Sequence, residues 1–183
     1  VPDSLLMVRL EGSLYQSQED KEKVETFYEN IFLQYPEETV FLLDRARWHW
    51  SKARPNKALQ DLETLFKLDP ENFEAHYLAG LIRIGIGEDE EALENLIKAG
   101  SLQDGHAEIW SHIANLWNRL GEPEKALAAI RKALELAPES YPYLQQYVNY
   151  LEARLDTHQS ETIAELRVTL KQLMWLESED SWV

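Results

Sequence analysis

The chain has 183 residues, a net charge of −15 and no cysteine, and 44% of its residues are hydrophobic. This composition excludes a disordered chain, a disulfide framework and zinc–thiolate sites. The acidic surface repels phosphate backbones and anionic lipid, so we expect no nucleic-acid partner. No apolar run reaches the roughly 18 residues that a membrane helix needs, so we expect no direct membrane insertion.

Four segments of equal length follow one another along the chain: 5–38, 39–72, 73–106 and 107–140. Small residues recur 34 residues apart, at Gly12, Ala46, Gly80 and Ala114. Prolines recur on the same period, at Pro36, Pro70 and Pro138. A fixed period of this length predicts a repeat protein in which each unit is a pair of helices that cannot bury its apolar face alone.

Residues 141–177 keep helical spacing of apolar residues but lose the recurring small residues and prolines. We interpret them as a divergent or capping helix pair at the end of a single domain that spans residues 1–183. Hairpin-turn signals between alternating apolar runs are missing, which favours an all-α fold. The chain begins with Val1, so we interpret it as a fragment of a longer chain.

The fourth segment carries the clearest motif. Apolar, aromatic and small residues recur in it with helical spacing, and a proline follows: Trp110-x2-Ile113-Ala114-x2-Trp117, Ala126-x3-Ile130 and Pro138. This motif resembles the tetratricopeptide repeat (TPR), whose 34-residue pattern is W-x2-L-G-x2-Y, A-x3-F and P. The resemblance implies an α-solenoid, a right-handed superhelical stack of antiparallel helix pairs.

Several positions depart from the family pattern. Glu11, Arg45, His49 and Arg83 stand where apolar or aromatic core residues are expected. We expect looser packing at these positions, with the long side chains extending their polar tips to solvent.

The resemblance also implies that the first helix of each pair lines a concave groove. Carried onto this sequence, the groove residues are Leu43, Asp44, Arg47 and Trp50, then Glu74, Tyr77, Leu81 and Ile84, then Ser111, His112, Asn115, Asn118 and Arg119, and finally Gln145, Gln146, Asn149 and Glu152. The groove thus changes from apolar and aromatic to rich in amides. Amide side chains both donate and accept hydrogen bonds, which suits an extended peptide or an inserted helix.

A purely structural role is the alternative for several of these residues. Tyr77, Leu81 and Ile84 would then pack mainly between neighbouring helices, and the amides of the fourth segment would be ordinary solvated surface. A subset of the family holds the acidic C-terminal peptide of chaperones with a two-carboxylate clamp. Asn115 and Asn149 stand one repeat apart as that clamp requires, but Ser111 occupies its first lysine position and no later Lys–Arg pair follows.

No catalytic or phosphate-binding motif is present, so we expect no enzyme and no cofactor. Glu108 and His112 lie four residues apart and offer two metal ligands, fewer than a metal site usually needs, so we expect no metal. The acidic run from Glu88 to Glu91 is typical of the first turn of a helix, where negative charge is favourable.

We therefore expect a non-catalytic protein–protein interaction scaffold that belongs to a larger assembly and binds a basic or neutral protein or peptide. The alternative is a segment of a bacterial envelope polysaccharide-export or secretion machine that guides polymer or recruits a processing enzyme. We expect a soluble chain, and the sequence leaves cytoplasm and bacterial periplasm both open.

The first helix adds one further expectation. Five of the six residues in Leu5-Leu6-Met7-Val8-Arg9-Leu10 are apolar, and they are distributed round the helix. A helix that is apolar on all sides requires cover on more than one side. We expect this helix to contact an upstream repeat or a second copy of the chain.

Overall fold

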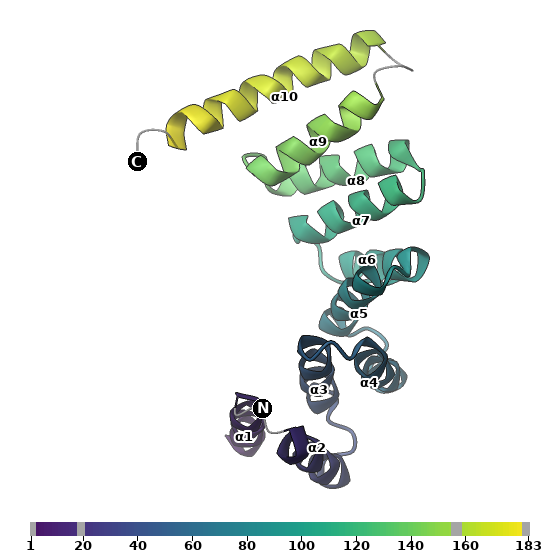
Figure 1. Cartoon of the computed structure of the whole chain (residues 1–183), viewed down its shortest axis with the longest axis vertical. Coiled ribbons are helices and arrows are strands. Elements are labelled where there is room, and N and C mark those ends of the chain that lie inside the picture. The colour runs from purple at the N-terminus through teal and green to yellow at the C-terminus, as the bar shows by residue number, and fades with distance from the viewer. Residues whose placement is uncertain (1–2, 18–20, 155–158, 181–183) are drawn as a thin grey trace. The chain divides into compact units, whose positions relative to one another are not determined.

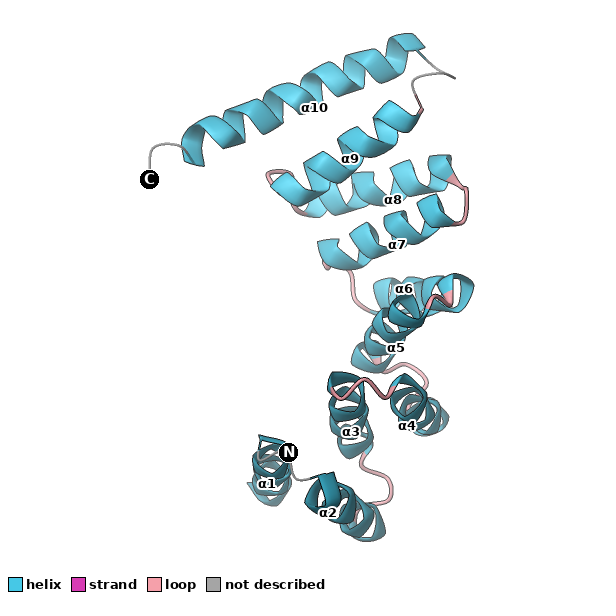
Figure 2. Ribbon diagram, viewed as in Figure 1, coloured by secondary structure: helices cyan, strands magenta, loops and turns pink. Residues whose placement is uncertain are grey.

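The computed structural model describes residues 3–17, 21–154 and 159–180 (Figure 1). These residues form ten α-helices joined by short loops, and they contain no strand (Figure 2). The helices are α1 (Asp3–Ser17), α2 (Lys21–Gln34), α3 (Thr39–Ser51), α4 (Pro55–Leu68), α5 (Phe73–Ile86), α6 (Asp89–Leu102), α7 (Ala107–Arg119), α8 (Pro123–Leu136), α9 (Tyr141–Ala153) and α10 (Gln159–Asp180). The predicted all-α fold is confirmed. None of the described helices combines the length and apolar character needed to cross a membrane.

The helix starts recur every 34 residues. The helices α3, α5, α7 and α9 begin at residues 39, 73, 107 and 141, while α4, α6 and α8 begin at 55, 89 and 123. Pro55 and Pro123 occupy the first turn of their helices, where the missing N–H group costs nothing. The division of the chain into one domain of four repeats and a C-terminal pair stays a prediction.

The turn before α4, α6 and α8 needs a residue in the left-handed backbone region. Gly87 and Gly121 supply it with φ of 83° and 77°, and Ala53 takes the same conformation with φ of 55° at the equivalent position. Glycine adopts this conformation without steric cost, whereas an L-residue does not. The same turn therefore precedes three helices, and in one of them an alanine takes the conformation that favours glycine.

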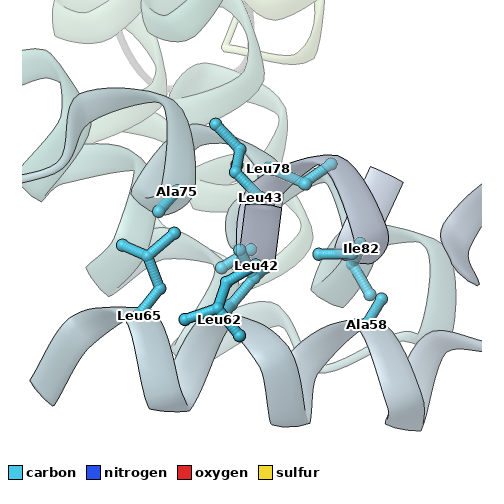
Figure 3. Packing of buried hydrophobic residues seen from close by; sticks show 10 residues of the cluster. Leu42, Leu43, Ala58, Leu62, Leu65, Ala75, Leu78 and Ile82 are labelled. Carbon is cyan, nitrogen blue, oxygen red and sulfur yellow. The ribbon is translucent and has the colours of Figure 1, made fainter. Parts of the chain in front are cut away.

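The chain divides into two compact units, Val1–Ile82 and Arg83–Val183. In the first unit, α3, α4 and the first part of α5 share one apolar core (Figure 3). Leu62 and Leu65 of α4 and Ile82 of α5 are completely buried in it. Ala46, Ala58 and Ala79 allow the helix backbones to approach one another there, while the larger residues fill the remaining space. A second cluster joins α1, α2 and α3, and its buried members are Leu5, Val24, Tyr28, Ile31, Phe41 and Trp48.

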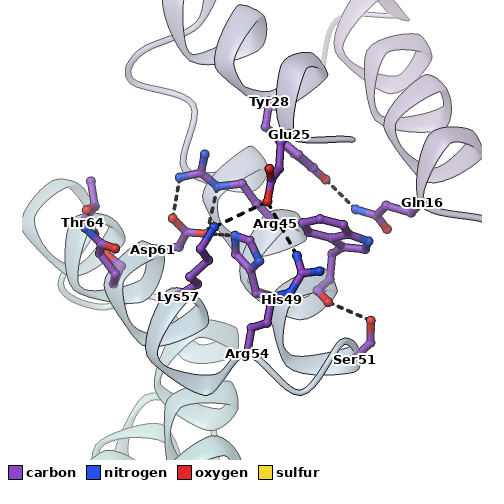
Figure 4. A network of polar contacts seen from close by, with 12 residues as sticks. Gln16, Glu25, Tyr28, Arg45, His49, Ser51, Arg54, Lys57, Asp61 and Thr64 are labelled. Carbon is purple, nitrogen blue, oxygen red and sulfur yellow. Dashed lines mark hydrogen bonds and ion pairs between the residues drawn. The ribbon is translucent and has the colours of Figure 1, made fainter. Parts of the chain in front are cut away.

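Two departures from the family pattern in α3, Arg45 and His49, belong to a polar network around one carboxylate of α4. The guanidinium of Arg45 donates two hydrogen bonds to Asp61 of α4, one of them from Nε to Oδ2 at 2.9 Å (Figure 4). His49 is only 5% exposed, and its Nε2 lies 3.9 Å from the same carboxylate. The expectation that the side chain reaches solvent is wrong for His49, which is buried, whereas Arg45 pairs with Asp61 and keeps 24% of its side chain exposed. Glu11 is also not a core residue, since it is exposed.

In the second unit, α7 and α8 form a helix pair whose facing sides carry Ile113, Ala114, Ala126 and Ile130, all of them buried. The motif residues Trp110 and Trp117 are half-buried. Lysines of α8 cover them, with Nζ of Lys132 and Lys125 at 4.1 Å and 4.4 Å from the two ring centroids.

Polar contacts tie α10 to the rest of the second unit. Arg131 of α8 donates to both carboxylate oxygens of Glu165 in α10 at 2.9 Å, and the hydroxyl of Tyr147 in α9 donates to the same carboxylate at 2.7 Å. Burial alone raises the pKa of Glu165, but these donors and the positive charge of Arg131 outweigh it and lower that pKa below its usual value. The carboxylate therefore stays charged and links three helices.

Candidate functional site

A groove of about 710 Å³ runs between α7 and α9 in the second unit. Its lining residues are predominantly uncharged amides and aromatics: Asn115, Asn118, Tyr141, Pro142, Gln145, Gln146, Asn149, Tyr150 and Ala153. Three buried residues of α7 face away from this groove and into the core: Ile113, Ala114 and Leu116. Helical spacing of three and four residues therefore directs Asn115 and Asn118 together into the groove.

A chain of hydrogen bonds fixes the floor of this groove. Ser111 Oγ donates to Oε1 of Gln146 at 2.6 Å, and Nε2 of Gln146 donates to the hydroxyl of Tyr150 at 2.8 Å. The Tyr150 hydroxyl in turn donates to Oδ1 of Asn115 at 2.7 Å. Burial raises the pKa of Tyr150, so its hydroxyl stays protonated and serves as a donor. The network orients the Asn115 amide, because its oxygen is already occupied.

The asparagine nitrogens of this groove are left to donate, whereas those of Gln145 and Gln146 are already engaged. Gln145 Nε2 bonds Oδ1 of Asn149 at 3.2 Å, so Asn149, like Asn115, has its oxygen engaged and its Nδ2 group open. The side chain of Asn118 makes no hydrogen bond to any other residue that the structure describes. Three exposed Asn side chains thus offer N–H donors in a groove whose lining carries no formal charge. An amide N–H group of this kind can donate a hydrogen bond to a neutral carbonyl oxygen.

Other predicted residues of α7 do not line this groove. Arg119 pairs with Asp89 of α6, with Nη2 and Oδ1 separated by 2.7 Å. His112 is half-buried, and burial lowers its pKa while Glu108 opposes that shift. Ser111 is engaged with Gln146, and Glu152 is exposed on α9 outside the groove lining.

A second, smaller groove of about 260 Å³ lies in the first unit between α1 and α3. It contains the predicted residues Asp44 and Arg47, but they are already paired. Arg9 of α1 donates to the two oxygens of Asp44 at 2.8 Å and 3.0 Å, and Nη2 of Arg47 donates to Glu74 at 2.7 Å. Pairing of this kind leaves few charges there for a ligand.

The α1 side of this smaller groove was missed by the sequence-based assignment. It consists of Leu6, Arg9, Leu10, Ser13 and Gln16. The signal that could have found these residues is the apolar character of the first helix on all its sides, because some of those side chains must face outward.

The remaining predicted residues lie outside both grooves. Leu43 is 5% exposed and belongs to the core cluster, so it offers no surface to a ligand. Trp50 packs partly buried against the same cluster, and the ring of Tyr77 stacks on Phe73 with centroids 6.2 Å apart. Leu81 and Ile84 are half-buried on α5.

Within the described part of the chain, no three His, Asp or Glu side chains gather closely enough to hold a metal ion. Glu108 and His112 therefore have no third ligand among these residues.

The family model of the tetratricopeptide repeat matches residues 6–154. The chain belongs to the tetratricopeptide repeat family. Members of this family are in general non-catalytic modules for protein interaction. Several solved structures share its fold at low sequence identity, and no curated protein matches it.

Three of these structures illustrate the range of sequence identity and of TM-score. MamA from Desulfovibrio magneticus RS-1 is 20% identical, covers 97% of each chain and has a TM-score of 0.78. PilF from Pseudomonas aeruginosa is 14% identical, with a TM-score of 0.71 over 92% of this chain and 73% of its own. YrrB, described as a TPR protein with an unusual peptide-binding site, is 20% identical, with a TM-score of 0.66 over 79% of this chain and 74% of its own. At these identities the similarity concerns the fold alone.

Proposed function

We propose that this chain is a non-catalytic scaffold of a larger assembly that binds an extended segment of a partner protein in the groove between α7 and α9. The observation that carries the proposal is the set of three Asn side chains, Asn115, Asn118 and Asn149, whose nitrogens are free to donate in one groove. A peptide in extended conformation presents carbonyl oxygens along its length, and amide donors suit them.

The groove favours a ligand segment without charge at the contact. None of its lining residues is Lys, Arg, Asp or Glu. A clamp for a terminal carboxylate needs cations, so a chaperone-type acidic peptide fits it poorly. The net charge of −15 favours a partner that is basic or neutral as a whole, because long-range attraction steers association.

One protein of similar fold supports the proposal that a peptide is bound. YrrB carries a peptide-binding site according to its description, and it shares this fold. No feature of the described residues favours the alternative role in polysaccharide export.

The test is a selection from a random peptide library on the whole chain, followed by calorimetric measurement of Kd for the selected peptides. The double variant Asn115→Ala, Asn149→Ala should weaken binding by about tenfold or more, which corresponds to about 1.4 kcal/mol. The matched control is charge reversal of the exposed Glu90, Glu91 and Glu94 on α6, which should leave neutral peptides bound.

The proposal fails if the Asn variant binds as tightly as the wild type and the α6 variant does not. A circular-dichroism spectrum of each variant checks that the helices are intact.

A further inference from the structure

The first helix has an uncovered apolar face. Leu6, Met7, Leu10 and Leu14 are 53%, 66%, 56% and 55% exposed, and their spacing of three and four residues places them on one side of α1. Leu5 and Gly12, on the opposite side, are buried towards α2 and α3. The helix therefore buries one apolar side within its own chain and leaves a second one open.

This open face has a defined shape. Leu6 and Leu10 form part of the wall of the small groove whose other side is Asp44 and Arg47 of α3. Glu11 borders the leucines on the other flank. It accepts a hydrogen bond from Tyr15 at 3.0 Å, and no cation among the described residues pairs with it. The face is thus an apolar strip with an unpaired carboxylate beside it.

The last helix has a corresponding strip. In α10, Thr162, Leu166, Thr169 and Leu173 are buried. Next to this buried face lies a row of exposed apolar residues, each one position after a buried residue. They are Ile163, Leu170 and Met174, which are 39%, 43% and 68% exposed.

Two cations border this second strip. Arg167 and Lys171 lie beside it on α10, are exposed, and make no ion pair with any residue that the structure describes. The chain has 33 acidic and only 18 basic residues, so two neighbouring cations beside an apolar strip form a local positive patch. They favour an acidic partner whose apolar residues follow helical spacing.

We propose that α1 of one copy packs against the exposed strip of α10 in a second copy, so that copies associate head to tail. Both strips are apolar with spacing of three and four residues, as helix–helix packing requires. The carboxylate of Glu11 is then available to Arg167 or Lys171. At 1.5 Å per residue, the 15 residues of α1 fit along the 22 residues of α10.

A contact between two different surfaces of the same molecule has a specific consequence. A copy joined through its α1 face still carries an α10 face, and the reverse also holds, so further copies can add until the arrangement closes on itself. The net charge of −15 on every copy opposes this association, so we expect it at high protein concentration.

The experiment is sedimentation velocity of the whole chain between about 10 and 500 µM, a range that covers weak contacts between copies. The wild type should grow in mass with concentration. The α1 variant Leu10→Glu, Leu14→Glu and the α10 variant Leu170→Glu, Met174→Glu should each stay monomeric. An equimolar mixture of the two variants should form dimers only, because each supplies the single face that the other has lost.

The matched control is Leu33→Glu on α2, a residue that is 83% exposed and lies on neither strip, and it should associate like the wild type. A wild type that is monomeric at every concentration overturns the proposal, as does a variant that still dimerises alone or a mixture that does not dimerise. Peptide binding in the α7/α9 groove is expected to be unchanged in both variants, so this result is separate from that of the proposed function.

Discussion

At the scale of single residues, Asp61 is the acid on which the charged network of α3 and α4 depends. It is 4% exposed and accepts two hydrogen bonds from Arg45. The change Asp61→Asn removes its charge and leaves the guanidinium without compensation. We expect a loss of about 2–4 kcal/mol in the free energy of unfolding, measured with urea.

Two further variants test the cause of that loss. Glu63→Gln changes an exposed acid on the same helix and should cost less than about 0.5 kcal/mol. Replacing both partners, as Arg45→Met with Asp61→Leu, should recover much of the stability, because no charge is then left buried. An equal cost for Asp61→Asn and Glu63→Gln would show that the network does not stabilise the fold.

Ala53 is a second residue whose backbone makes a measurable prediction. Its φ of 55° is the conformation that Gly87 and Gly121 adopt in the equivalent turns. Ala53→Gly should therefore raise the free energy of unfolding by about 0.5–1 kcal/mol. The same change at Ala128, an exposed position inside α8, should lower it by about 1 kcal/mol. A loss of stability from Ala53→Gly would contradict this account of the turn.

At the scale of helices, the small residues on the 34-residue period set how closely neighbours approach. Ala114 in α7 and Gly80 in α5 are buried. Ala114→Leu and Gly80→Leu should each cost about 1–3 kcal/mol or more and lower Tm, because the added side chain has no space. Ala128→Leu, on the exposed side of α8, is the control and should leave Tm nearly unchanged. Unchanged Tm for both buried variants would mean that the assigned helix faces are incorrect.

At the scale of the whole molecule, stability should differ between the helices. Among residues 5–17 of α1 only Leu5 and Gly12 are buried, whereas α8 buries five residues, from Ala126 to Ala133. Stability in repeat proteins depends on contacts between neighbouring elements. We therefore expect the backbone amides of α1 to exchange with deuterium at least about tenfold faster than those of α8 in dilute protein.

Protein concentration provides the control for this measurement. If copies associate through α1, its protection should increase as the concentration rises, while that of α8 should not change. Exchange of α1 that is as slow as that of α8 in dilute solution would contradict the expected difference.

Part of the α7/α9 groove could be read from the sequence because it depends on spacing within single helices. Asn115 and Asn118 lie three residues apart on α7, and Gln145 and Asn149 lie four apart on α9, so each pair shares a face. The roles of Tyr141 and Tyr150 in the lining were not predicted. An aromatic ring forms part of a groove wall only if the neighbouring helix is rotated to face it. The spacing of residues within one helix does not determine that rotation.

The sequence by itself determined the all-α fold, the period of 34 residues and the positions of the small residues, because prolines, turns and helical spacing act over a few neighbouring positions. The tertiary structure decided which polar groups are already paired. Arg45 meets Asp61 16 residues away, and Arg119 meets Asp89 on another helix. Such pairs depend on the distance and rotation between helices, and this geometry left the Asn nitrogens of α7 and α9 free while it removed Arg119 and Leu43 from the candidate site.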